Sequence, residues 1–141
     1  PLAARPLDPV LAIVRERLGV ILARARALAA AGEHEAAELD LREILASDPD
    51  HADARSDLGC VLWQRSEHDL ALVSWRQALA VDPDHLDATV NLASALLASQ
   101  RAAEAADFCR DVLSRTPWAD EVLGMLRQAE RALRYAGLPA A

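Results

Sequence analysis

The chain has 141 residues and is 52% hydrophobic, which suits one domain with a continuous core. Its formal net charge is −7, and this acidic balance argues against binding to the phosphate backbone of nucleic acids. No run approaches the roughly 18 apolar residues that a membrane span requires, and no secretory leader is present, so we expect neither membrane insertion nor secretion.

Residues 1–17 are predicted to be an N-terminal extension that continues into the first helix. Asp8 and Pro9 suit the N-cap and the first turn of a helix, and the helical pattern then continues to Ala31. This helix would be about two turns longer than its repeat requires.

The apolar residues of this first helix cover more of its circumference than one core-facing stripe of roughly 100° needs. They are Val10, Leu11, Ile13, Val14 and Leu18. The extra surface could be covered by the following helix, by upstream residues, or by a twin helix across a two-fold axis. We predict the last of these, a homodimer through the long first helix.

A period of 34 residues runs through the rest of the chain. Pro49, Pro83 and Pro117 stand at this interval, and the first two lie in identical Asp-Pro-Asp-His sequences. Small residues recur at the same interval, where two helices could approach closely; they are Ala25, Gly59 and Ala93, and Ala37, Ala71 and Ala105. This period indicates stacked copies of one supersecondary unit, which we place at 18–51, 52–85 and 86–119.

Each copy is predicted to hold two antiparallel helices, and no segment shows the sustained alternation of a strand. In the middle copy, Asp50 is the expected N-cap of a helix over 51–64, and Ser66 begins the second helix, which ends before Pro83. Thr116 and Pro117 then begin a C-terminal capping helix over 117–136. Gly137 is expected to end that helix in the left-handed conformation, before a tail over 137–141.

The middle copy carries a set of signature residues at fixed offsets, namely Leu58, Gly59, Leu62, Ala71, Trp75, Ala78 and Pro83. This pattern resembles the tetratricopeptide repeat (TPR). The outer copies depart from it at Arg24, Ile44 and Val112, and at Ala25 and Ala93, where glycine is usual. The resemblance implies an all-α, right-handed solenoid of antiparallel helix pairs, in which the first helices line a concave groove for a partner's peptide or helix.

The resemblance also gives candidate groove residues. They are Leu22 and Arg26 from the first copy, Asp53, Ser56, Asp57, Cys60, Trp63 and Gln64 from the second, Val90, Asn91, Ser94 and Leu97 from the third, and Glu121, Met125 and Gln128 from the capping helix. Trp63 is either a binding hot spot or a ring that packs against the adjacent first helix.

Acidic residues recur at one end of the candidate groove, at Asp53, Asp87 and Glu121. They could select a basic ligand, but each lies in a helix's first turn, where the helix dipole favours a carboxylate, and we favour this structural cause. Family members that grip a ligand's terminal carboxylate use Lys and Arg at first-helix positions. Here those positions hold Leu22, Asp57 and Asp87, with Asn91 and Arg26 only partly suitable, so such a clamp is not expected.

No catalytic motif is present, so we predict a protein that is not an enzyme and needs no cofactor. The four histidines form two pairs spaced by 34 residues, His34 with His68 and His51 with His85. They sit at turns, no cysteine or carboxylate completes a tetrahedral set, and we expect no metal site.

The leading hypothesis is therefore a non-enzymatic protein-interaction module. The alternatives are a targeting domain of a larger enzyme, such as a glycosyltransferase or hydroxylase, and a secretion-chaperone-like protein with a dimerising N-terminal helix. Cys60 and Cys109 fall on different helices of different copies, so we expect reduced thiols, which suit a cytoplasmic protein.

Overall fold

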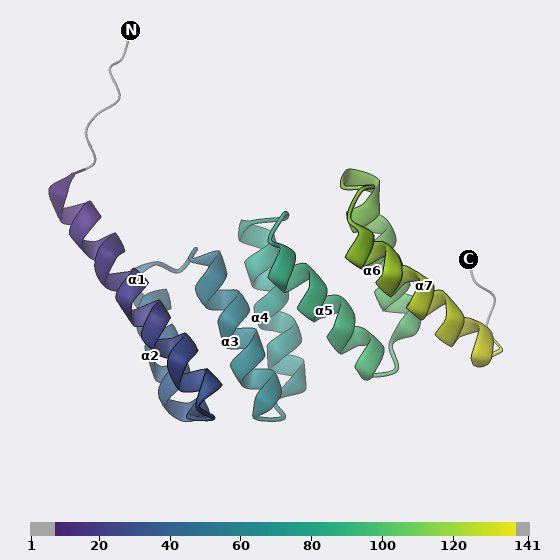
Figure 1. The fold of residues 1–141 in the computed structure, drawn as a ribbon, viewed down its shortest axis with the longest axis horizontal. Coiled ribbons are helices and arrows are strands. Elements are labelled where there is room, and N and C mark those ends of the chain that lie inside the picture. Colours follow the sequence, from purple (N-terminus) through teal and green to yellow (C-terminus); the bar gives the residue numbers. More distant parts are fainter. Residues whose placement is uncertain (1–7, 138–141) are drawn as a thin grey trace, which may run out of the picture.

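A computed structural model describes residues 8–137, and within this range the chain forms seven α-helices and no strand (Figure 1). The helices are α1 (Pro9–Ala30), α2 (His34–Ser47), α3 (Ala52–Gln64), α4 (His68–Val81), α5 (Leu86–Ala98), α6 (Ala102–Arg115) and α7 (Asp120–Tyr135). They stand as a row of antiparallel pairs, with α1 at one end and α7 at the other. The predicted all-α solenoid is confirmed. Residues 1–7 of the extension and 138–141 of the tail lie outside the described part.

Helix α1 starts and extends as its sequence indicates. The Asp8 carboxylate accepts a hydrogen bond from the Val10 N–H at 2.9 Å, and Pro9 occupies the first turn. The helix has 22 residues, whereas α3 and α5 have 13 each. Its first buried residue is Leu18, so residues 9–17, here called the α1 overhang, are all exposed, and Arg17 at their end makes a 3.7 Å ion pair with Glu43 of α2.

The predicted start of α3 is wrong by one residue. The Asp50 N–H donates to the Asp48 carboxylate at 3.2 Å, so Asp50 belongs to the turn. His51 is the N-cap, and its Nδ1 accepts a hydrogen bond from the Ala54 N–H at 3.1 Å. The same arrangement begins α5, because both helices follow the same Asp-Pro-Asp-His sequence.

The predicted N-cap of α4 is also wrong, since Ser66 belongs to the end of α3. Ser66 has a φ of 62°, its N–H donates to the Trp63 carbonyl, and the following Glu67 N–H donates to Leu62. This pair of bonds is a Schellman motif, which closes a helix with one left-handed residue. The N-cap of α4 is therefore Glu67.

The capping helix starts later than predicted. The Thr116 hydroxyl donates to the Val112 carbonyl at 2.9 Å, which ties it to the end of α6 instead of the start of the next helix. Helix α7 begins at Asp120, with Ala119 as its N-cap. It ends as expected, with Gly137 at a φ of 73°.

All six of the predicted small residues are buried. Gly59 shows why size matters at these positions. A Cβ built on Gly59 would lie 2.5 Å from Nε1 of Trp75, so any side chain would collide with the indole ring. The same ring is held in place by a 3.1 Å hydrogen bond from its Nε1 to the Ser56 carbonyl.

Each helix of the described chain packs only on its first and second neighbours in sequence. The main apolar cluster runs from α1 through α7, and a smaller one lies beneath the capping helix, formed by Ala93, Cys109, Val112 and Val122. Helix α7 thus covers the apolar face that the third pair would otherwise expose. No helix in the described part combines the length and apolar character needed to cross a membrane.

Candidate binding groove

Helices α1, α3 and α5 carry most of the predicted groove residues, and the structure leaves most of them at least partly accessible. The exposed ones are Arg26, Asp53, Gln64, Ser94, Glu121 and Gln128. The partly exposed ones are Asp57, Cys60, Trp63, Val90, Asn91, Leu97 and Met125. Leu22 and Ser56 are different, since they are only 8% and 1% exposed. They belong to the core, which corrects the prediction for these two residues.

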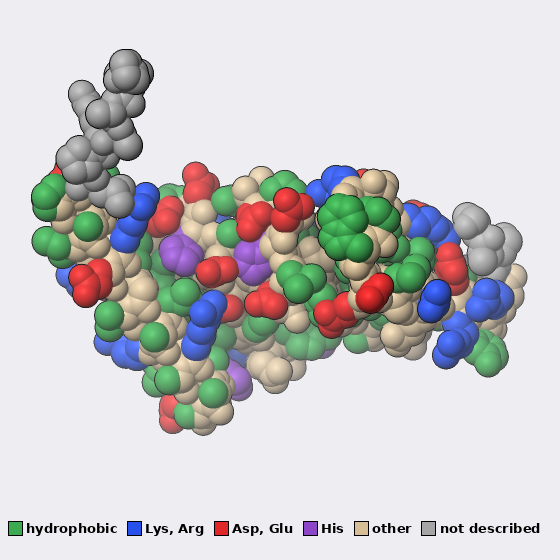
Figure 2. Space-filling model, turned by 45° about the horizontal axis from the view of Figure 1, so that its top comes forward, with side chains coloured by type: hydrophobic (Ala, Val, Ile, Leu, Met, Phe, Trp, Pro, Cys, Tyr) green, Lys and Arg blue, Asp and Glu red, His purple; other side chains and the backbone are tan. Residues whose placement is uncertain are grey.

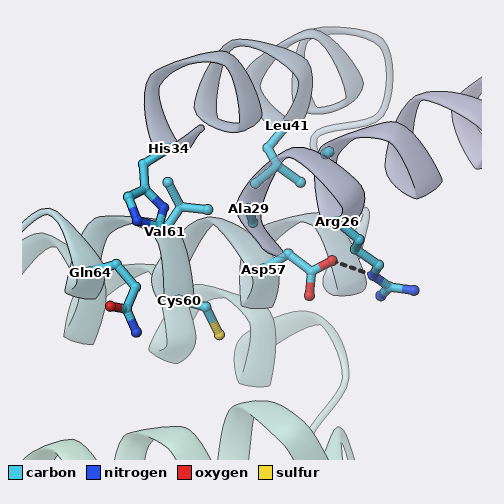
Figure 3. Close-up of a pocket in the computed structure, with 9 residues that line it drawn as sticks. Arg26, Ala29, His34, Leu41, Asp57, Cys60, Val61 and Gln64 are labelled. Carbon is cyan, nitrogen blue, oxygen red and sulfur yellow. Dashed lines mark hydrogen bonds and ion pairs between the residues drawn. The ribbon is translucent and has the colours of Figure 1, made fainter. Parts of the chain in front are cut away.

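An open cavity of about 260 Å³ lies between α1, α2 and α3 (Figure 3). Apolar side chains form much of its wall, and polar groups stand at its rim; the lining residues are Ala25, Arg26, Ala29, His34, Leu41, Asp57, Cys60, Val61 and Gln64. The Nδ1 atom of His34 is buried here and has no hydrogen-bond partner within the described chain. The cavity can therefore accept an apolar side chain beside a charged rim.

A second open cavity, of about 230 Å³, continues the first one toward α5. The two cavities share Cys60 and Gln64, and the second adds Trp63, Trp75, Asn91, Ser94, Ala95 and Ala98. We call the two together the binding groove. Because they adjoin, a single segment of a partner could occupy both.

The ring of Trp63 contacts α4, the second helix of its own copy, and its role as a hot spot stays a prediction. Its ring stacks on His68 with the centroids 4.0 Å apart, and it lies 6.0 Å from the ring of Trp75. It nevertheless stays partly exposed and lines the second cavity. Trp63 is thus a fixed ring held by its own repeat, with one part open to the groove.

Acidic side chains gather over the middle of the molecule (Figure 2), and Asp57 is the carboxylate that lines the first cavity. The Asp57 carboxylate accepts a hydrogen bond from Nε of Arg26 at 2.6 Å. Burial raises the pKa of Asp57, Arg26 acts to lower it, and the nearby charges of Asp53 and Asp87 raise it again. The pKa of Asp57 is raised overall, so the folded protein disfavours the negative charge of this side chain.

Asp53 makes a contact that the sequence did not predict. Its carboxylate lies 2.6 Å from Nε2 of His85. Because Nδ1 of His85 accepts the Ala88 N–H, the proton of the neutral ring is on Nε2, which donates to Asp53. This contact links the start of α3 to the start of α5.

Two contacts across the first helices share a spacing that sequence reasoning missed. Arg26 and Asp57 are 31 residues apart, and so are Cys60 and Asn91, whose amide nitrogen lies 3.3 Å from the Cys60 sulfur. This spacing is the 34-residue period less about one helical turn. These two contacts therefore join positions that are about one helical turn short of equivalent.

The cysteines are free thiols in different surroundings. Cys60 is partly exposed, and burial together with the charge of Asp57 raises its pKa. Cys109 is buried beneath α7, and burial raises its pKa to about 11. No group of three or more His, Cys, Asp or Glu side chains within residues 8–137 is arranged to hold a metal ion.

A family comparison agrees with this architecture. The tetratricopeptide repeat model matches residues 22–75 and 56–120. The chain belongs to the tetratricopeptide repeat family. Together these TPR matches cover most of the stack, from α1 to the start of α7. No curated protein sequence matches the chain.

Solved TPR structures share the fold at low sequence identity. The first TPR of Spaghetti (RPAP3) bound to an HSP90 peptide matches with a TM-score of 0.73 and 18% identity, over 84% of this chain and 94% of that chain. The Sgt2 TPR domain from Aspergillus fumigatus matches with a TM-score of 0.75 and 17% identity, over 86% of this chain and 82% of that chain. The Yersinia enterocolitica type III secretion translocator chaperone SycD (alternative dimer) matches with a TM-score of 0.70 and 18% identity, over 82% of this chain and 92% of that chain.

Proposed function

We propose that the chain is a non-catalytic TPR module that binds a segment of a partner protein in its groove. The observation that carries this proposal is the pair of adjoining cavities, which share Cys60 and Gln64 and together extend from α1 to α5. Each cavity offers an apolar wall with polar groups at the rim, and grooves of this kind take anchor side chains of a helix or an extended peptide. The fixed ring of Trp63 supplies an amphipathic contact surface in the second cavity.

We infer that the preferred segment carries Lys or Arg beside its apolar anchors. Asp53 and Asp87 lie in first turns, where the helix dipole alone would favour them, but Asp57 lies beyond the first turn of α3 and is half-buried. The raised pKa of Asp57 means that its charge weakens the fold at neutral pH. A basic ligand would offset the mutual repulsion of the three carboxylates, which favours a binding role for this cluster.

The ligand is not expected to be read by a C-terminal carboxylate. The solved TPR domains of RPAP3 and yeast Sti1 are described with HSP90 and Hsp70 peptides, which gives a precedent for peptide binding on this fold. In this chain, however, Arg26, the one cation among the described residues that line the groove, is already engaged by Asp57, and the charges of Asp53 and Asp87 lie near this pair. A free carboxylate would meet like charge there.

The two alternative functions stay predictions. A targeting role for a larger enzyme would be tested by the reading frame on either side of this segment. A secretion-chaperone role has the likeness to SycD as a precedent for the architecture, together with an unusually long first helix. Neither alternative requires a different groove.

The binding function is tested by panning a random peptide library against the protein. We expect the enriched peptides to contain Lys or Arg next to apolar residues, and their affinity to fall as NaCl is added. Gln64→Arg should abolish binding, because Gln64 is exposed where the two cavities meet and the longer side chain would place a positive charge there. Enrichment of acidic peptides, or of peptides that need a free C-terminus, would contradict the proposal.

A matched pair of variants separates ligand binding from helix stabilisation. Asp87 and Asp69 are both exposed first-turn carboxylates, of α5 and α4 respectively, so each substitution to Asn removes a similar dipole interaction. Of these two residues, Asp87 but not Asp69 acts on the charges of the Arg26–Asp57 pair. We expect Asp87→Asn to weaken the enriched basic peptides about threefold or more, and Asp69→Asn to leave their affinity unchanged. Equal effects would assign the acidic residues a purely structural role.

A further inference from the structure

Trp118 is a large apolar residue that the fold does not require. It is 75% exposed and lies in the turn between α6 and α7. The equivalent positions one and two periods earlier are Asp84 and Asp50. All three turns contain the same backbone hydrogen bond between residues three apart, at 3.1, 3.1 and 3.2 Å. Because aspartate supports this turn equally well, the presence of an exposed tryptophan needs a different explanation.

The surroundings of Trp118 form a concave apolar surface. An open cavity of about 320 Å³ lies beside it, with Pro83, Val112 and Val122 among its lining residues. Leu86, on the same rim, is 58% exposed, and its equivalents in the neighbouring copies are the smaller Ala52 and the charged Asp120. We call this surface the Trp118 pocket. It lies at the α4–α5 and α6–α7 turns and shares no residue with the binding groove.

The α1 overhang is a second apolar surface that the stack does not need. The other first helices complete their packing with 13 residues, whereas α1 extends by a further nine. Its large apolar side chains are all exposed; they are Val10, Leu11, Ile13 and Val14. This surface is convex, because it is a free length of helix, and its apolar residues lie three and four apart as in helices that dock into grooves.

The two surfaces cannot meet within one molecule. The N-terminal end of α1 and the α6–α7 turn lie along the same edge of the stack and are far apart along its long axis (Figure 1). A neighbouring molecule, in contrast, could bring its α1 end to the other end of the first molecule. We propose that the α1 overhang of one molecule docks in the Trp118 pocket of a second copy, giving head-to-tail self-association.

This arrangement accounts for more of the exposed apolar surface than a pair of twin helices. The overhang is only about 13 Å long, at 1.5 Å per residue, so two overhangs packed on each other would bury a small area and leave Trp118 in water. Docking in the pocket covers both surfaces at once. The contact is still smaller than a standard interface of roughly 800 Å² per partner, so the association should be weak and concentration-dependent. A head-to-tail contact gives open chains, or rings where the rotation closes.

Sedimentation velocity over a range of concentrations tests the proposal with three variants. Val14→Glu adds a charge to the overhang, and Trp118→Ala removes the ring from the pocket. Each should raise the dissociation constant at least about tenfold, as expected for a central apolar contact. Leu39→Glu is the matched control, because Leu39 is 70% exposed on α2 and belongs to neither surface, and it should associate as the parent does. Circular dichroism confirms that every variant is folded.

Mixing the two defective variants distinguishes the possible interfaces. The Val14→Glu molecule keeps an intact pocket and the Trp118→Ala molecule keeps an intact overhang, so the mixture should form a 1:1 complex and nothing larger. If two overhangs pack together instead, Trp118→Ala will still self-associate and the mixture will gain no new complex. That result overturns the proposal, as does a parent protein that stays monomeric at every concentration.

Discussion

The contact between Gly59 and Trp75 shows how one residue choice fixes another. Where α4 carries Trp75, the facing position is glycine; where α2 and α6 carry the smaller Leu41 and Cys109, the facing residue is alanine. A Cβ at Gly59 would lie 2.5 Å from the Trp75 ring, so the pair must change together. The indole and the missing Cβ are therefore one packing unit.

Gly59→Ala should lower the free energy of unfolding by about 1 to 3 kcal/mol, because the ring must move from its hydrogen bond to the Ser56 carbonyl. In a Trp75→Leu background the same change should cost much less, since the pair then matches the first repeat. Urea unfolding of the four proteins gives the coupling energy. Strictly additive effects would contradict the packing explanation.

At the same scale, the candidate groove was only partly predictable. The family resemblance placed Arg26, Asp57 and Trp63 on the groove, and the structure leaves all three at least partly exposed. The resemblance could not show that Ser56 lies in the core and not in the groove, because burial depends on how the helices pack. The Ser56 side chain is buried, and its carbonyl accepts the hydrogen bond from Trp75. The Arg26–Asp57 and Cys60–Asn91 contacts were missed because their partners are 31 residues apart, and aligning equivalent positions searches only at 34.

At the scale of helices, the ends were harder to predict than the helices themselves. Asp50 and Ser66 are residue types that favour N-caps, but the structure uses them in the preceding turn and helix end. The first helices all end in the same Schellman motif, whose left-handed position holds Gly32, Ser66 and Gln100 in the three copies. Only Gly32 marks that position clearly in the sequence, because the left-handed region favours glycine.

This motif predicts a stabilising substitution. Ser66 has a φ of 62°, where a side chain costs roughly 1 kcal/mol, so Ser66→Gly should raise the free energy of unfolding by about 0.5 to 1 kcal/mol. Ser99→Gly is the control, because Ser99 has a φ of −88° and glycine would only add unfolded-state entropy there. Thermal and urea unfolding measure both. A destabilised Ser66→Gly protein would show that the hydroxyl matters more than the backbone.

For the whole molecule, the 34-residue period was enough to predict the architecture. Each copy buries its small residues against its own partner helix, and the large ones fill the spaces between layers, so the period in the sequence becomes the period of the stack. The period does not predict the role of residues that depart from it. The α1 overhang and the exposed Trp118 both depart from the period, and the surfaces proposed for self-association contain these departures.

A stack in which helices contact only their first and second neighbours should lose stability locally. Val122 is 1% exposed in the cluster beneath α7, and Ile44 is fully buried in the first pair. Val122→Ala should cost about 1 to 3 kcal/mol and speed amide hydrogen exchange in α5, α6 and α7, while α1 and α2 keep their protection. Ile44→Ala should do the reverse. If either variant increases exchange equally in all seven helices, the described stack unfolds as one cooperative unit, and three repeats with a cap are too short for the ends to open independently.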